Sequence, residues 1–550
     1  MKLSADLRLA PVSSGTPTIK RLISQVRSLS PLTTALGGVV IFGLVLRIAR
    51  LFTPKLWTDE AFSAAISKEP LIQIISLTLR HDSHPPLYYI QLHFWQLISD
   101  SDTWLIINSV VLSFFSTISV FLVLKFLYGR REALIGLAVF SVLPLEVIFS
   151  ETLRMYCLEN LLVIWMFYVA ECFIRDKESD HRNLVIFVML GSLINMLHGF
   201  GAMVTFFIVI YTFVRALEER IPRRQFLKIF LASLTVGITT LYSLIVGSMR
   251  QTIGLESSNL SAISSEITIS LLGFNIPCPS IMGVIFVVPF IVLCLFEKRS
   301  RSIVWWLFIA PTILMILISI FIKPVYTFRG TGLFMPFEAI GFAVFAGSRV
   351  GRVEVPNETR GLPVFAMVSL VGFLSVLSVA SFYNAMTYRK GGFEQVSNFW
   401  ATRSKPGDVI YVNSFLSDYL GFVRYLPGAA RPAVHEVQAP PPAHWQKIFS
   451  RIGPTWVQRL HLLPDANSLP YRARTVFPWF DGAIAGQRAR FWVLQPNGAG
   501  CGLPDYHVTM QDKDGTYSVL LCERIVSAGA RVAPFPAPFA RSAPELGARP

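Results

Sequence analysis

WLIINSVVLSFFSTISVFLVLKFL, residues 104–127, is an apolar stretch whose one charged residue, Lys125, stands near its end. A helix needs about 20 such residues to cross the hydrocarbon core of a bilayer. Similar apolar runs recur along the chain. They cover residues 34–52, 132–149, 156–174, 184–198, 200–216, 229–248, 280–296, 303–321, 331–347 and 362–382. The sequence therefore predicts an α-helical polytopic membrane protein with about 11 transmembrane helices.

The composition of the 550 residues also indicates a membrane protein. Apolar residues make up 53% of the chain and charged residues only 15%, whereas an ordinary soluble protein carries about 25% charged residues. Too few charges are present to cover the surfaces of several soluble domains, which excludes a soluble enzyme and a disordered scaffold. The net charge of +15 is explained by basic loops beside membrane helices, which follow the positive-inside rule. We therefore expect no nucleic-acid partner.

Lysine and arginine in the loops predict the orientation of the chain. With the N-terminus in the cytoplasm, 22 basic residues fall inside and seven fall outside before residue 382. Arg47 and Arg50, near the outer end of the first span, are exceptions. Residues 85–99 are apolar but short, and a crossing there would invert every later loop, so we expect them at the outer interface.

The chain divides into four segments by composition. Residues 1–33 form a cytoplasmic segment, 34–382 the membrane domain with its first outer loop at 53–103, 385–525 a small outer α/β domain, and 526–550 a disordered tail rich in Pro, Ala and Gly. Strand-like runs in the third segment are KPGDVIYVNS (405–414), ARFWVLQP (489–496) and YSVLLCERI (517–525), and SDYLGFVRYL (417–426) has helical spacing. Cys501 and Cys522 both belong to this domain and predict a disulfide in an oxidising compartment, with two free thiols as the alternative.

Adjacent carboxylates, Asp59 and Glu60, follow the first span directly. Such a pair is a candidate for general-base catalysis or for metal binding. A structural interpretation is compatible with this one: Thr58 would cap a helix that carries both acids in its first turn.

Four further polar clusters are predicted to open on the same outer side. They are HDSHPPLYY (81–89); Glu151 with Arg154, Tyr156 and Glu159; His198; and Lys323 with Tyr326 and Arg329. Each alone has a structural explanation, such as an interfacial turn or an i,i+3 ion pair in a helix. Their convergence on one side indicates a functional site, since ionisable groups near a bilayer are costly.

The motifs LWTDEAFSAA (56–65) and HPPLYY (84–89), followed by RMY (154–156) and a late Tyr-x-x-Arg (326–329), resemble polytopic glycosyltransferases of the GT-C class. Most similar are bacterial glycosyltransferase family 39 and its relatives: protein O-mannosyltransferases, aminoarabinose transferases and rhizobial galacturonosyltransferases. The resemblance covers roughly residues 35–345. One departure is that the family's Gln-Glu-Ala-Arg-Met-Tyr is replaced by Glu-Thr-Leu-Arg-Met-Tyr at 151–156. The acid is therefore one residue earlier, about 100° around a helix.

The resemblance implies an inverting transferase in the plasma (inner) membrane. Its donor would be a sugar on a polyprenyl phosphate, and its acceptor would be a lipid, glycan or protein outside the cytoplasm. Asp59 matches the catalytic carboxylate and Glu60 completes the catalytic motif. The implied substrate-binding residues are Asp82, His84, Tyr88, Glu151, Arg154, His198, Lys323, Tyr326 and Arg329.

The residues suit this chemistry independently. A base must take the proton of the acceptor hydroxyl, and cations must balance the charge of the leaving phosphate. No cofactor is required, although Asp59 and Glu60 could hold a divalent metal. Two alternatives remain: a secondary transporter, against which no internal repeat is found, and a flippase or lipid-binding protein for polyprenyl-linked saccharides, which would not need the acidic pair.

Overall fold

The computed structural model describes somewhat less than three fifths of the chain. The described residues are 31–52, 54–81, 84–175, 181–250, 294–295, 297–321, 327–351, 372, 375–376, 378–380, 383, 393–405, 408, 410–412, 421–422, 424–426, 490–496, 506–514 and 517–524. Of the predicted spans, 280–296 and 362–382 lie largely outside this part, as does the predicted tail at 526–550.

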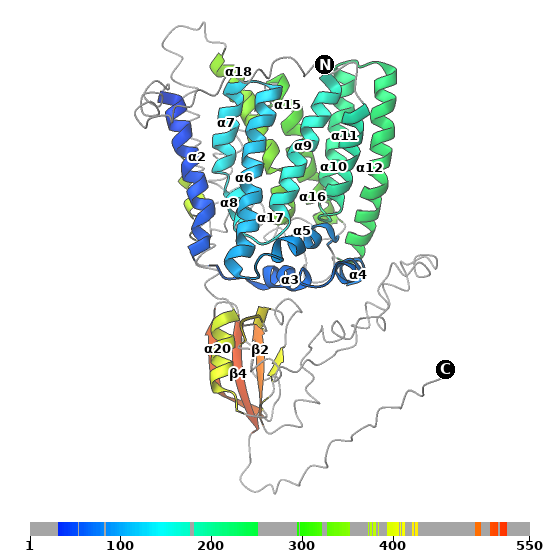
Figure 1. Cartoon of the computed structure of the whole chain (residues 1–550). Coiled ribbons are helices and arrows are strands. Elements are labelled where there is room, and N and C mark those ends of the chain that lie inside the picture. Colours follow the sequence, from blue (N-terminus) through cyan, green and yellow to red (C-terminus); the bar gives the residue numbers. More distant parts are fainter. Residues whose placement is uncertain are drawn as a thin grey trace, which may run out of the picture.

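A bundle of long helices makes up most of the described molecule (Figure 1). Its elements are α2 (Pro31–Ala49), η1 (Arg50–Phe52), α6 (Asp102–Leu127), α7 (Arg130–Ser141), α8 (Pro144–Ser150), α9 (Tyr156–Arg175), α10 (His181–Asn195), α11 (Gly201–Glu218), α12 (Arg223–Arg250), α15 (Lys298–Val304), the π-helical segment η2 (Trp305–Ile309), α16 (Ala310–Phe321), α17 (Phe328–Thr331), η3 (Gly332–Phe334) and α18 (Met335–Gly351). Many large apolar side chains on the bundle remain exposed, among them Ile41, Phe115 and Leu234. A face of this kind suits contact with lipid.

Within the described residues, six helices are long and apolar enough to cross a membrane, or seven if a bent pair counts as one span. The bent pair is α7 and α8, which meet at 65°. The span predicted at 132–149 is therefore two helices that meet at a bend, and not one continuous helix. Pro144 begins α8, and a proline disfavours helical backbone at the residue before it. The total of 11 spans stays a prediction.

Three short helices, α3 (Thr58–Ile66), α4 (Leu71–His81) and α5 (Leu87–Gln96), lie across one end of the bundle (Figure 1). At ten residues, α5 is too short to cross a bilayer. Its Tyr88, Tyr89 and Leu92 are fully buried, so one face of α5 packs against the rest of the protein. This arrangement matches the expectation that residues 85–99 do not cross.

Beyond the same end lies a small α/β unit (Figure 1). It contains α20 (Phe393–Arg403) and a four-stranded sheet of order β1-β2-β4-β3. The strands are β1 (Ile410–Val412), β2 (Arg490–Pro496), β3 (Tyr506–Asp514) and β4 (Tyr517–Arg524). Strand β1 is parallel to β2, and the other pairs are antiparallel. Trp400, Trp492 and Phe422 are buried in its separate core.

Candidate functional site

Asp59 lies in the first turn of α3, the helix that follows the first span. The helix begins at Thr58 and its cap residue is Trp57, so the expected capping role of Thr58 is wrong. Instead, Glu60, the third residue of α3, accepts the Trp57 N–H with its carboxylate at 3.1 Å. This hydrogen bond caps the N-terminus of the helix. Asp59 and Glu60 both lie in the first turn, as expected.

The Glu60 carboxylate is completely buried and is held by donors from three directions. Arg50 donates to it through Nη1 and Nη2 at 2.8 and 2.7 Å. The backbone N–H groups of Trp57 and Leu153 donate at 3.1 and 3.0 Å. Glu60 therefore joins the end of the first span, the start of α3 and the segment after α8.

The Asp59 carboxylate faces cations instead. Arg329 Nη1 lies 2.8 Å from Asp59 Oδ2, and 27% of the Asp59 side chain and 37% of the Arg329 side chain remain exposed. Burial alone would raise the pKa of Asp59, but the charges of Arg154 and Arg329 outweigh it, so this pKa lies below its ordinary value. Asp59 is thus ionised and open to a substrate.

Arg154 connects the carboxylate to a pair of histidines. Its Nη1 donates to Ser63 Oγ at 3.0 Å and to the Asp59 carbonyl at 3.3 Å. Its Nη2 lies 3.2 Å from His84 Nε2. Because a guanidinium only donates, His84 Nε2 accepts in this contact. The His84 ring stacks on that of His198 with centroids 5.1 Å apart.

His198 and Tyr156 complete this side of the site. Their rings meet edge to face, with centroids 5.9 Å apart, and His198 Nδ1 accepts the Phe200 N–H at 3.3 Å. Both side chains are buried. Residues from the first loop, the α8–α9 segment, the α10–α11 connection and α17 therefore meet at one end of the bundle.

The segment 151–155 differs from the sequence-based interpretation. Helix α8 ends at Ser150 and α9 begins at Tyr156, so Glu151 and Arg154 are not i,i+3 neighbours in a helix, and the inferred 100° rotation of the carboxylate does not apply. The segment turns back so that Leu153 N–H reaches Glu60. Glu151 is buried at the end of α8.

Two of the other predicted residues are described by the structure, and four are not. Tyr88 is buried on α5, and burial raises the pKa of its hydroxyl well above the usual value. Cys522, on β4, is disulfide-bonded. Asp82, Lys323, Tyr326 and Cys501 lie outside the described residues, so their roles, and the pairing of Cys501 with Cys522, stay predictions.

Two contributors were missed in the sequence. Arg50 holds Glu60, and the Trp57 ring lies 5.3 Å from the Arg329 guanidinium. A signal for Arg50 existed: it is one of two arginines at the end of the first span where basic residues are otherwise scarce, and an acid follows ten residues later.

The surroundings of Asp59 do not suit a divalent cation. Two guanidinium groups face the carboxylate, and their positive charges would oppose a metal ion there. Glu60, the other expected ligand, has its oxygens occupied by four donors. Among the described residues, no group of three or more His, Cys, Asp or Glu side chains is arranged to hold a metal.

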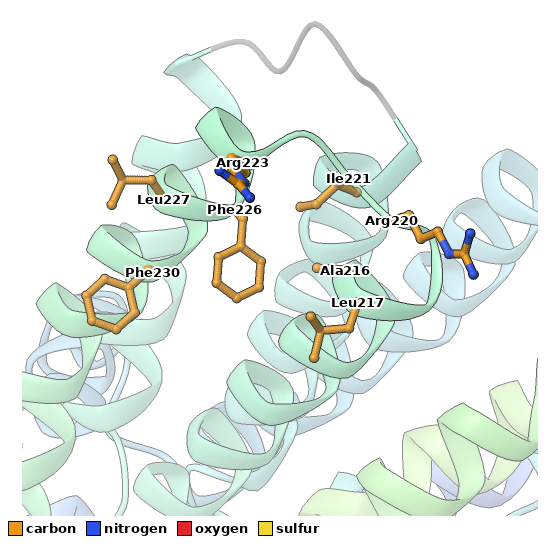
Figure 2. A pocket seen from close by; sticks show the side chains of 8 residues that line it. All are labelled: Ala216, Leu217, Arg220, Ile221, Arg223, Phe226, Leu227 and Phe230. Atoms are coloured by element: carbon orange, nitrogen blue, oxygen red, sulfur yellow. The ribbon is translucent and has the colours of Figure 1, made fainter.

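A pocket of about 440 Å³ lies between α11 and α12, away from this site (Figure 2). It is at the far end of the bundle from α3, where the α11–α12 connection runs. Its lining residues are Ala216, Leu217, Arg220, Ile221, Arg223, Phe226, Leu227 and Phe230. None of these side chains is a carboxylate or a nucleophile, so this pocket is not the candidate active site.

No protein-family model matches the chain. No curated protein matches it either. Among solved structures, ArnT from Cupriavidus metallidurans in the apo state is similar, with a TM-score of 0.53 and 13% identity over 88% of this chain and 98% of ArnT. The same protein bound to undecaprenyl phosphate gives 0.47, with the same identity and coverage. The Archaeoglobus fulgidus oligosaccharyltransferase gives 0.44 at 9% identity over 72% of this chain and 64% of that one.

The likeness to apo ArnT shows the fold. The chain is a mostly helical protein with the fold of ArnT, and several of its helices are long and apolar enough to cross a membrane. The predicted class, an α-helical polytopic membrane protein, is confirmed. The number of spans and the position of the C-terminal domain outside the cytoplasm stay predictions.

Proposed function

We propose that this protein transfers a sugar from a polyprenyl-phosphate donor to a hydroxyl acceptor with inversion, and that Asp59 is the general base. The observation that carries the proposal is the Asp59 carboxylate, ionised, partly exposed, and flanked by Arg329, Arg154 and His84. One small site thus combines a proton acceptor with cations suited to a phosphate. The sequence resemblance to GT-C transferases supports the same chemistry, and a fold of that type is compatible with it.

In the proposed reaction, the acceptor oxygen attacks the anomeric carbon from the face opposite the phosphate. Its proton moves to Asp59 as the new C–O bond forms. The bond between the anomeric carbon and the phosphate oxygen breaks, and the electron pair leaves with polyprenyl phosphate. Arg329 and Arg154 would stabilise the charge that develops on that phosphate.

Donor binding would also adjust the base. Arg329 and Arg154 keep the pKa of Asp59 low while they face the carboxylate. A bound phosphate would share those positive charges, and the pKa of Asp59 would then rise because burial acts in that direction. Asp59 would become a stronger base once the donor is in place.

The neighbouring residues would take supporting parts. Glu60 is a positioning residue in this proposal, since its oxygens are held by Arg50 and by two backbone N–H groups. His84 would contact the donor phosphate beside Arg154, and His198 would support His84 through ring stacking. No step in this mechanism uses a metal.

The proposed acceptor is a lipid, a glycan or a protein outside the cytoplasm. In the proposed orientation, the end of the bundle that carries α3 and the C-terminal α/β unit faces away from the cytoplasm. The basic connections at the other end, such as 125–131 and 215–224, would then face inward.

The test is Asp59→Asn in proteoliposomes. A panel of radiolabelled sugars on undecaprenyl phosphate, with membranes of a deletion strain as the acceptor source, first identifies the donor. Turnover of Asp59→Asn should fall by about 10²- to 10⁴-fold, the usual contribution of a general base. Binding of undecaprenyl phosphate itself should survive, because the phosphate contacts come from other residues.

Glu218→Gln is the matched control. Glu218 lies at the opposite end of the bundle, on the surface, paired with Arg215, and its loss should leave turnover unchanged. Near-normal turnover in a folded Asp59→Asn protein would refute the proposal and put a transporter or lipid-binding function ahead.

A further inference from the structure

We propose that Tyr425 of the C-terminal unit is a positioning residue for Asp59; this inference rests on the proposed function. The Tyr425 hydroxyl accepts the Leu56 N–H at 2.8 Å and donates to Asp102 Oδ2 at 2.5 Å. Leu56 is fully buried and lies three residues before Asp59. The hydroxyl therefore joins the segment that leads to the carboxylate with the first turn of α6.

Arg424 strengthens the same contact. Its Nε and Nη2 donate to Asp102 Oδ1 at 2.9 and 2.7 Å, and its Nη2 also donates to the Asp100 carbonyl at 2.8 Å. Only 15% of each of the Arg424 and Asp102 side chains is exposed. Both donors reach the same carboxylate oxygen, and an ion pair that is buried to this degree contributes more than an exposed surface pair.

Arg424 and Tyr425 are held in place by the hydrophobic core of the C-terminal unit. Phe422 and Leu426, on either side of them in the sequence, are buried in the core that contains Trp492. Ser397 Oγ, on α20, donates to the Phe422 carbonyl at 2.9 Å. Arg424 and Tyr425 are thus anchored to the α/β unit, and their contact cannot shift without moving that unit or breaking the hydrogen bonds.

The bundle holds the other side of segment 54–57. Arg50 Nη2 donates to the Lys55 carbonyl at 2.6 Å, and Glu60 holds the Trp57 N–H. Trp57 in turn caps α3 and places its ring near the Arg329 guanidinium. The segment therefore lies between two sets of fixed donors and acceptors. Loss of the Tyr425 hydroxyl would release Leu56 and loosen both Trp57 and Asp59.

The experiment compares Tyr425→Phe with Tyr168→Phe in the full chain. Tyr168 is the matched control, since it lies on α9 12 residues after Tyr156, about 18 Å along the helix from the site. We expect kcat of Tyr425→Phe to fall about 2- to 10-fold, the scale of one hydrogen bond. KM for the donor should stay within about twofold, because Tyr425 contacts no proposed phosphate ligand. Tyr168→Phe should match the parent protein.

A second measurement needs no activity. Hydrogen exchange of the peptide that contains Leu56 should become faster in Tyr425→Phe and stay unchanged in Tyr168→Phe. If Tyr425→Phe does not fold, Asp102→Asn tests the contact from the bundle side and should give the same loss of kcat.

The outcomes separate this inference from the proposed function. Unchanged kcat in Tyr425→Phe, or a rise in KM alone, overturns the positioning role even when Asp59→Asn is inactive. An active Asp59→Asn protein overturns the proposed function, whatever Tyr425→Phe does, and the positioning role with it. Loss of kcat and faster exchange in Tyr425→Phe, with an inactive Asp59→Asn, support both.

Discussion

Arg329 has two roles at the site, one toward Asp59 and one toward the donor phosphate. It pairs with the carboxylate at 2.8 Å, which favours the ionised form, and in the proposed function it also binds the donor phosphate. The two uses compete for one guanidinium, and this competition couples the state of the base to donor binding.

Arg329→Gln should move the acid limb of the kcat/KM profile to higher pH. In the parent protein this limb reports the pKa of Asp59 in the free enzyme. Because that pKa is lowered, the limb should lie below about pH 3.9, the ordinary pKa of an aspartate. Without the Arg329 charge, burial acts against fewer cations and the pKa rises. Arg329→Lys keeps the charge, so its limb should stay in place, while the loss of the planar fork lowers donor affinity by about 10-fold or more.

The same sign governs stability. A carboxyl whose pKa is lowered by folding stabilises the fold above its unfolded pKa, about 3.9, and that contribution disappears as the pH falls through the lower folded value. Arg329→Gln should reduce it. An acid limb that does not move in Arg329→Gln would contradict the assignment of Asp59 as the titrating base.

At the scale of elements, α2 and α7 approach each other at Gly43. A Cβ atom built on Gly43 would lie 2.2 Å from the Ser141 carbonyl oxygen at the end of α7. The same carbonyl accepts a hydrogen bond from Arg47, which also donates to the Phe140 carbonyl at 3.1 Å. These contacts hold the broken end of α7, where the helix cannot satisfy its own carbonyl groups.

Gly43→Ala should therefore destabilise the protein by about 1–3 kcal/mol, the usual cost of overpacking. Gly38→Ala, on the same helix, is the control, since a Cβ atom there has nothing within 4 Å. It should keep or slightly raise the thermal midpoint, because alanine favours helix more than glycine does. Thermal unfolding in one detergent measures both variants, and equal midpoints would show that the close approach is not limiting.

Long apolar runs predicted α2, α6, α9, α11 and α18 well, because a span is decided by local hydrophobicity. The break between α7 and α8 was missed because the apolar run continues through Pro144 and hides it. What makes the break tolerable is Arg47, some 94 residues away. Contacts of this range cannot be read from a local pattern.

In the C-terminal unit, too, some elements could be predicted from the sequence and others could not. Strands β1, β2 and β4 were predicted because their apolar residues belong to a buried core. Strand β3, YHVTMQDKD at 506–514, was missed because it is an edge strand with a polar, exposed sequence, as is common where a sheet must avoid further pairing. For the candidate site, the sequence identified Asp59, Arg154 and Arg329. The turn at 151–155 and the contact with Tyr425 depend on tertiary packing alone.

At the scale of the whole molecule, the orientation in the membrane can be tested directly. Single cysteines replace Lys68 and Ser101, near α3 and the start of α6, or Arg131 and Glu219, at the opposite end of the bundle. All four residues are exposed. In intact spheroplasts, an impermeant thiol reagent should label positions 68 and 101 completely and positions 131 and 219 only after permeabilisation.

The background protein should lack reactive native thiols, so Cys157, Cys172, Cys278 and Cys294 are replaced first. Labelling of position 131 in intact spheroplasts would place Asp59 on the cytoplasmic side. The proposed donor and acceptor would then have to be found there.

The two arginines at the end of the first span bear on how the chain is made. The Arg50 partner, Glu60, is ten residues away, so at 5–20 residues per second the two leave the ribosome about 0.5–2 s apart. The Arg47 partners Ser113 and Ser141 come 66 and 94 residues later, about 3–20 s at the same rate. During that interval the first helix carries an uncompensated charge that the bilayer core disfavours. We therefore expect insertion of this helix to depend on an insertase that shields Arg47 until α6 and α7 arrive.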